Sequence, residues 1–175
     1  MRMFLAGFLT AAVLLILGAF LYVRLGYVDP RADTPVSALE SAIAMPALDA
    51  SVDRHASDAK NPVPADSANL TAGMKIYQSD CSSCHGDAAH PEAVFADNLN
   101  PRPPQFVTDA PDMPENQNFY IVEHGIRFSG MPSLQKILTP QQAWQVTTFL
   151  SHMDKLPPDV QAQWKTLASA PAPQQ

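Results

Sequence analysis

Both cysteines of the chain, Cys81 and Cys84, stand within one short stretch that ends in His85. A disulfide between them would close too short a loop to stabilise a domain, and a small disulfide-stapled domain should show several spaced cysteines. A thioredoxin-like redox pair would begin a helix inside a βαβ pattern, which this sequence lacks. A structural disulfide therefore explains the stretch poorly, and a thiol oxidoreductase is only a remote alternative.

Metal or cofactor binding is the next explanation for these three side chains. A structural zinc site needs four ligands, and the adjacency of Cys84 and His85 would strain a tetrahedral shell. The other histidines belong to no paired motif: His55, His90, His124 and His152. C-x-x-C-H is instead the signature of c-type haem attachment. Its spacing lets both sulfurs reach one porphyrin edge while the imidazole points at the iron, so we expect one covalently attached haem c at Cys81, Cys84 and His85.

Helical periodicity runs through the compact part of the chain, from about residue 70 to about residue 156. The first segment, "NLTAGMKIYQSDC", repeats apolar residues at helical intervals, and the second, "PENQNFYIVEHG", ends at Gly125, which can stop a helix. The third, "TPQQAWQVTTFLSHM", begins with Thr139 in a T-x-x-Q capping box. No strand pattern competes, so the sequence predicts an all-α domain. Residues 86–113 form a long loop, and a bulky apolar cofactor would complete the core there.

These segments resemble the single-haem class I cytochrome c family, particularly its membrane-tethered bacterial members. The resemblance covers residues 67–156 and rests, in the family's order, on "GMKIYQSDCSSCHG", "NPRPPQF", "IVEHGIRFSGMPSL" and "TPQQAWQVTTFLSHM". It implies a small class I cytochrome c fold wrapped around the covalent haem. Cys81 and Cys84 would form the thioether bonds, His85 would be the proximal iron ligand, and a methionine would be the distal one.

The resemblance also implies two supporting contacts. A proline carbonyl on the loop after the haem motif, from Pro103 or Pro104, should accept a hydrogen bond from the proximal histidine; Pro104 is the candidate. Gly73 should lie where the first helix crosses the last, because a small residue allows close contact with Val146 or Phe149.

Met131 is the candidate for the distal ligand. It stands in "SGMP", between a glycine that lets the backbone approach the ring and a proline that fixes the turn. It also matches the family's G-M-P loop between the second and third helices. Met113 precedes a proline too, but lies before the second helix, and Met153 follows the spacing of core residues. A histidine such as His124, or an open iron site, is the remaining alternative.

From Met3 to Val23 the sequence carries no charge, and Arg2 and Arg24 flank this run. At about 1.5 Å per residue a helix of this length reaches roughly 32 Å, which matches a hydrocarbon core of about 30 Å. A cleaved signal peptide has a shorter apolar region and an A-x-A-like site, and no such site follows. We therefore expect a retained single-pass anchor that contacts the lipid bilayer through residues 3–23. Basic residues on both sides leave its orientation open on charge alone.

The sequence divides into four expected parts. They are a transmembrane anchor at residues 1–24, a flexible Pro- and Ala-rich periplasmic linker at 25–66, the cytochrome c domain at 67–156 and a C-terminal tail at 157–175. Within the linker, Thr34 could cap a short helix that starts at Pro35.

Two filled axial positions would leave oxygen and peroxide nowhere to bind, so the iron could only exchange electrons. The expected function is electron transfer by a carrier that cycles between ferrous and ferric haem, without enzymatic activity of its own. Because bacterial haem c is installed outside the cytoplasmic membrane, the resemblance implies an inner-membrane protein with its haem domain in the periplasm. A quinol-oxidising complex or a dehydrogenase is the expected donor, and a terminal oxidase is the expected acceptor.

Other functions stay open at this stage. The chain could be a tightly bound cytochrome c subunit of a larger respiratory oxidase or dehydrogenase complex. If Met131 leaves the iron, it could instead be a haem sensor or a small peroxidase. A nucleic-acid partner is not expected, since the formal net charge is -6 and phosphate binding relies on clustered Lys and Arg.

Overall fold

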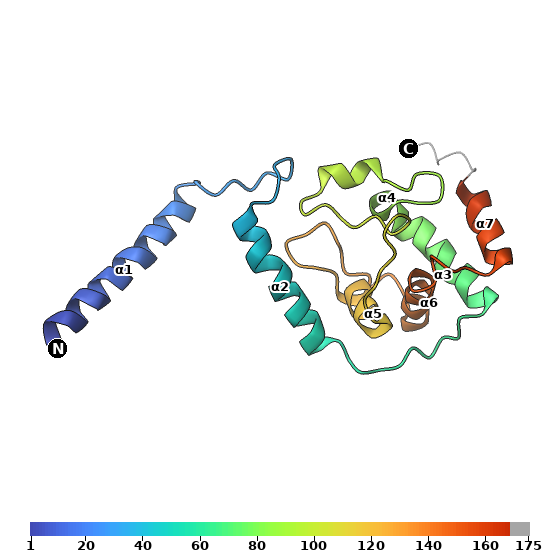
Figure 1. Ribbon diagram of the computed structural model, residues 1–175, viewed down its shortest axis with the longest axis horizontal. Helices are drawn as coiled ribbons and strands as arrows, with labels where there is room; N and C mark the ends of the chain where they lie inside the picture. Colours follow the sequence, from blue (N-terminus) through green and yellow to red (C-terminus); the bar gives the residue numbers. More distant parts are fainter. Residues whose placement is uncertain (169–175) are drawn as a thin grey trace. The chain divides into compact units, whose positions relative to one another are not determined.

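The computed structural model describes residues 1–168, and over that range it contains seven α-helices, one short 3-10 helix and no strand. The all-α prediction is therefore confirmed. The chain forms two compact units, one of residues 1–31 and one that begins at residue 32 (Figure 1).

Helix α1 (Arg2–Arg24) makes up most of the first unit, and none of its residues is buried. Its length and apolar composition are sufficient to cross a membrane. The helix ends where the amide of Leu25 donates to the carbonyl of Leu21. It coincides with the uncharged run for which the sequence predicts a membrane span.

Helices α3 (Ser67–Asp80) and α6 (Pro140–Leu150) pack against each other and form the core of the second unit. Gly73 allows this close approach, because a Cβ atom there would collide with the backbone carbonyl of Gln145 and with the side chain of Phe149. The family resemblance implied that Gly73 lies where the first predicted helix crosses the last. The contact between Gly73 and α6 is that crossing.

The helix ends follow the local signals in the sequence. Asp66 caps α3 by accepting a hydrogen bond of 2.8 Å from the amide of Asn69. Thr139 caps α6 in the predicted capping box with Gln142. Helix α5 (Glu115–His124) ends at Gly125, whose φ of 67° lies in the left-handed region.

Two short elements lie in the connection between α3 and α5. They are α4 (Ser82–His85) and the 3-10 helix η1 (Val94–Asn98). Helix α5 then packs on α6, where the rings of Phe119 and Trp144 stack with centroids 3.9 Å apart. The long loop that the sequence predicts between residues 86 and 113 is thus present, with only η1 within it.

Helix α7 (Pro158–Ala168) occupies the region for which we expected a tail. Val160 and Trp164 are buried, and the indole of Trp164 meets the rings of Tyr77 and Phe149 edge-on at 5.7 and 5.4 Å. Pro158 stands at the start of this helix, where its missing amide hydrogen costs nothing. The rest of the expected tail, 169–175, lies outside the described residues.

Helix α2 (Ala38–His55) lies in the region for which we expected a flexible linker. Its cap is Ser37, whose hydroxyl accepts from the amide of Glu40 at 3.1 Å, so the helix starts three residues after the expected Pro35. Ala-rich sequence favours a helix, and one apolar side chain on it, Val52, is almost fully buried, with 2% exposure.

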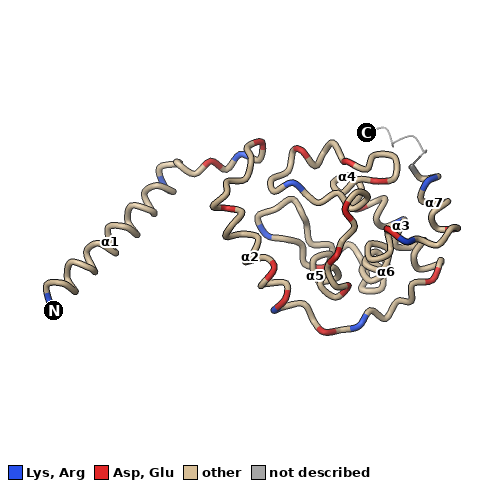
Figure 2. Tube along the Cα trace, viewed as in Figure 1, with Lys and Arg blue, Asp and Glu red and all other residues tan. Residues whose placement is uncertain are grey.

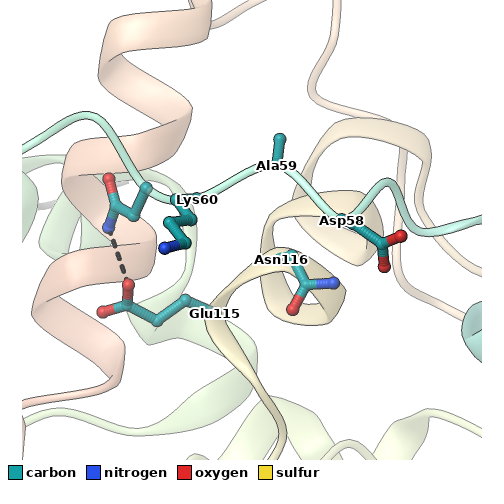
Figure 3. Close-up of a pocket in the computed structure, with 6 residues that line it drawn as sticks. Asp58, Ala59, Lys60, Glu115 and Asn116 are labelled. Carbon is teal, nitrogen blue, oxygen red and sulfur yellow. Dashed lines mark hydrogen bonds between the residues drawn. The ribbon is translucent and has the colours of Figure 1, made fainter.

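The segment after α2 contacts α5 and α6. Asn61 donates to the carboxylate of Glu115 at 3.0 Å (Figure 3) and to the hydroxyl of Thr148 at 2.8 Å. From α5, the side chain of Gln117 donates to the carboxylate of Asp53 on α2 at 2.7 Å. Much of the expected linker is therefore packed through a few polar contacts, which a reading of composition alone does not reveal.

Candidate functional site

Cys81 and Cys84 lie at the junction of α3 and α4. Cys81 ends α3, and its carbonyl accepts hydrogen bonds from the amides of Cys84 (3.1 Å) and His85 (3.0 Å). Both thiols are free and partly buried. Gly86 ends the turn with a φ of 81°, and a Cβ there would collide with the carbonyl of Pro91. The backbone thus brings the two cysteines and the histidine of the motif together in one tight turn.

His85 is buried, and one side of its ring is fixed. Its Nδ1 lies 2.8 Å from the carbonyl oxygen of Pro104. Because a carbonyl can only accept, Nδ1 carries the proton and Nε2 keeps the lone pair that can bind a metal. Burial lowers the pKa of His85, partly opposed by the bond to Pro104, so the imidazole is neutral at neutral pH, as a metal ligand must be.

The loop that carries Pro104 follows the backbone of the motif closely. The amide of Phe106 donates to the carbonyl of His85 at 3.1 Å. The imidazole of His85 and the ring of Phe106 stack, with their centroids 4.3 Å apart and an angle of 5° between their planes. The carbonyl of Pro103 accepts from the side chain of Gln105 at 2.9 Å, so of the two prolines it is Pro104 that contacts His85. Gln105 itself is buried, although no periodic pattern in the sequence marks it.

Met131 lies on a separate loop between α5 and α6. Its amide donates to the hydroxyl oxygen of Ser129 at 3.1 Å, and its carbonyl accepts from the amide of Ile126 at 3.1 Å. Beside it, Gly130 lies close to the side chain of Leu99, so that an added Cβ would come within 2.9 Å of a Leu99 methyl group. The half-buried Met131 is thus held in a defined turn next to the loop that follows η1.

The alternative ligands have other surroundings. Met153 packs against the hydrophobic core, as its helical spacing predicts. The carbonyl of Met113 accepts from the side chain of Asn118 at 3.0 Å, in the loop before α5. His124 is exposed, with Nε2 3.6 Å from the carboxylate of Glu123. The choice of Met131 over these residues stays a prediction.

The donor atoms fit a haem better than a zinc ion. Among residues 1–168, no three His, Cys, Asp or Glu side chains are grouped so as to hold a metal ion by themselves. A metal at His85 therefore needs ligands from outside that set, such as a porphyrin and a methionine sulfur. Two free thiols in the same turn as His85 are the groups that covalent haem attachment requires.

The surroundings of the Cys81 thiol do not favour the thiolate form that a redox nucleophile needs. Burial raises its pKa to about 12, with smaller contributions from Asp80 and Cys84. Reactive cysteines of oxidoreductases have a lowered pKa, because the thiolate is the attacking form. This environment disfavours the thiol oxidoreductase alternative.

Charged residues are spread over the second unit. Figure 2 shows acidic positions along α2 and in the loops, and Lys and Arg occur among them rather than on one element of the described part of the chain. Arg102 is one such cation, with Glu92 at 2.7 Å and Asp97 at 2.8 Å. These exposed ion pairs tie residues around η1 to the loop that leads to Pro104.

Comparison with protein families finds that residues 68–150 match the family described as "Cytochrome C oxidase, cbb3-type, subunit III". No curated protein matches the chain. Among solved structures, a chain of the reducing HAO-like protein complex of Kuenenia stuttgartiensis is similar, with 19% sequence identity and a TM-score of 0.44. The similarity covers 66% of this chain and 60% of that one, so less than two thirds of the relative's length is spanned.

Proposed function

We propose that the chain is a membrane-anchored electron carrier with one covalently attached haem c, held by the cytochrome c domain that residues 68–150 match. In this proposal Cys81 and Cys84 would hold the haem through thioether bonds, and His85 and Met131 would be its iron ligands. The observation that carries it is the hydrogen bond of 2.8 Å between His85 Nδ1 and the Pro104 carbonyl, which orients the histidine of the cysteine turn.

The chain's own residues bind and orient the group. When bound, haem c supplies one-electron chemistry, with an iron that alternates between ferrous and ferric states. His85 offers a neutral Nε2 on one side, and Met131 offers a thioether sulfur, which raises the reduction potential. If His85 and Met131 both bind the iron, no position would be left for oxygen or peroxide, so the group would only exchange electrons.

We assign α1 as a single-pass anchor in a bacterial inner membrane, with the cytochrome domain in the periplasm. The support for the anchor is the length and apolar composition of α1. The support for the orientation is that bacterial haem c is attached outside the cytoplasmic membrane, as the family resemblance implies. The proposed donor is a quinol-oxidising complex or a dehydrogenase, and the proposed acceptor is a terminal oxidase.

Haem attachment tests this proposal directly. The full chain, made in bacteria that mature c-type cytochromes, should keep its haem during extraction with acidic organic solvent. The double variant Cys81→Ala/Cys84→Ala should make any bound haem extractable, because both thioether bonds are lost, whereas each single variant should keep the haem through its remaining thioether bond. Ser83→Ala is the matched control, since Ser83 is exposed in the same turn. A colourless wild-type protein would rule out the proposed function.

A second candidate function is a tightly bound subunit of a terminal oxidase. Residues 32–61 belong to the second unit, so only residues 25–31 connect α1 to it. Fully extended, this connection reaches at most about 24 Å, whereas a freely flexible linker of about 40 residues has a root-mean-square reach of roughly 35 Å and far longer extremes. A short connection limits how far the cytochrome domain can move, which suits binding to one fixed partner. In addition, the matching family is described as an oxidase subunit.

Native gel electrophoresis of membranes in mild detergent separates the two candidates. A subunit should migrate with terminal oxidase activity, whereas a carrier should migrate alone. A variant with about 20 Gly and Ser residues inserted between residues 28 and 29 is the matched control. A subunit should stay in the complex despite this insertion, because its binding does not depend on the connection.

A further inference from the structure

The side chain of Gln105 connects three backbone segments around His85. It is buried, with 4% exposure. Its Nε2 donates to the carbonyl oxygens of Cys84 (3.0 Å) and Pro103 (2.9 Å), and its Oε1 accepts from the amide of Ala93 (2.7 Å). One amide therefore joins α4, its own loop and the segment that leads into η1.

The loop needs such a side chain because its backbone has few donors. Pro103 and Pro104 have no amide hydrogen, so neither residue can tie the loop to a neighbouring segment by donating a hydrogen bond. The Gln105 amide holds the carbonyl of Pro103 on one side of Pro104. The amide of Phe106 holds the other side, through its bond to the carbonyl of His85. Pro104 is thus fixed between two anchored points.

This arrangement determines where the acceptor for His85 lies. The Pro104 carbonyl meets Nδ1 of His85 at 2.8 Å, and the Gln105 bond to the Cys84 carbonyl ties the same loop to the residue next to His85. Loss of the Gln105 amide would leave the carbonyls of Cys84 and Pro103 and the amide of Ala93 without this partner. The loop would then be free to move the Pro104 carbonyl away from the imidazole.

We propose that Gln105 is a positioning residue, which sets the reduction potential of the site by holding the Pro104 carbonyl at Nδ1 of His85. The inference rests on the proposed function, since it requires His85 to be an iron ligand. A hydrogen bond donated by Nδ1 makes the imidazole a stronger electron donor, which favours the oxidised metal. Weakening this bond therefore shifts the potential upward.

Two uncharged variants test the inference in the full-length, haem-loaded protein. Gln105→Met preserves side-chain length and removes all three hydrogen bonds, and Gln105→Leu does the same with a different shape. Gln145→Met is the matched control, because Gln145 is a part-buried amide that donates to Asn69 at 3.0 Å between α6 and α3. Redox titration gives the potential, and nuclear magnetic resonance gives the rate at which the His85 Nδ1 proton exchanges with solvent.

The inference requires two changes together. The Nδ1 proton should exchange about tenfold faster or more in the Gln105 variants, which corresponds to about one net hydrogen bond. The potential should also move upward from the values of the wild type and Gln145→Met. If either change is missing or no larger than in Gln145→Met, the inference is wrong.

Two further outcomes are also decisive. If both Gln105 variants fail to fold while Gln145→Met folds, Gln105 serves folding alone and the inference fails. If the wild-type protein carries no covalent haem, the proposed function fails, and that result is visible before any variant is compared.

Discussion

The hydroxyl of Tyr77 donates a hydrogen bond of 2.8 Å to the carbonyl of Gly86 and one of 3.1 Å to the carbonyl of His85. The phenol is fully buried, and burial raises its pKa above the usual value, so the group stays a donor. Since Tyr77 belongs to α3, the packing of the helical core is coupled through this contact to the turn that carries His85.

Tyr77→Phe should lower the free energy of unfolding by about 1–3 kcal/mol, because the buried Gly86 carbonyl loses its donor and the His85 carbonyl keeps only the amide of Phe106. The packing of the ring against Phe149 and Trp164 should persist. Urea unfolding followed by circular dichroism measures the loss. Tyr120→Phe is the control at a partly exposed position, where we expect a change within about 0.5 kcal/mol. Equal losses in the two variants would mean that the Tyr77 hydrogen bonds contribute little.

Gly73→Ala should destabilise the second unit, because the new Cβ would collide with the Gln145 carbonyl. Separating two packed helices costs about 1–3 kcal/mol or more. Thermal unfolding of the full chain in detergent gives the change. Gly7→Ala is the matched helical control, since nothing lies within 4 Å of the added atom. A Gly73 variant as stable as the Gly7 variant would contradict the close packing of α3 on α6.

The elements that could be predicted from sequence are those with local signals. The capping box at Thr139 and the helix stop at Gly125 involve residues only a few positions apart, so they can be recognised without a fold. The cysteine turn is equally local, because the C-x-x-C-H spacing itself brings Cys81, Cys84 and His85 together. These signals were sufficient for the all-α class and for three of its helices.

The elements that differ from expectation depend on distant partners. In α7, Val160 and Trp164 have helical spacing, but the two prolines before them resemble the end of a domain, and the burial of Trp164 depends on Tyr77 and Phe149. In α2, a single buried valine gives no periodic pattern. Gln105 is a similar case, since its three partners are brought together only by the fold.

Residues around α2 should resist proteolysis as long as Val52 is buried. Val52→Asp should expose residues 32–61 to cleavage, because an unpaired charge would replace an apolar side chain of 2% exposure. Limited proteolysis followed by mass spectrometry measures the rate. Ile43→Asp is the control on the same helix, at a position that is 63% exposed, and should be cleaved as slowly as the wild type. Rapid cleavage of the wild-type protein in this region would support the flexible linker instead.

Met131→Ala should abolish the weak absorption band near the red end of the spectrum that reports iron–sulfur ligation. It should also lower the reduction potential, because thioether sulfur favours ferrous iron and its loss removes that preference. Visible spectroscopy and redox titration of the purified holoprotein measure both effects. Met113→Ala is the control, since Met113 also precedes a proline but lies before α5 rather than after it. If Met113→Ala removes the band and Met131→Ala keeps it, the distal ligand is on the loop before α5, and the assignment of Met131 is wrong.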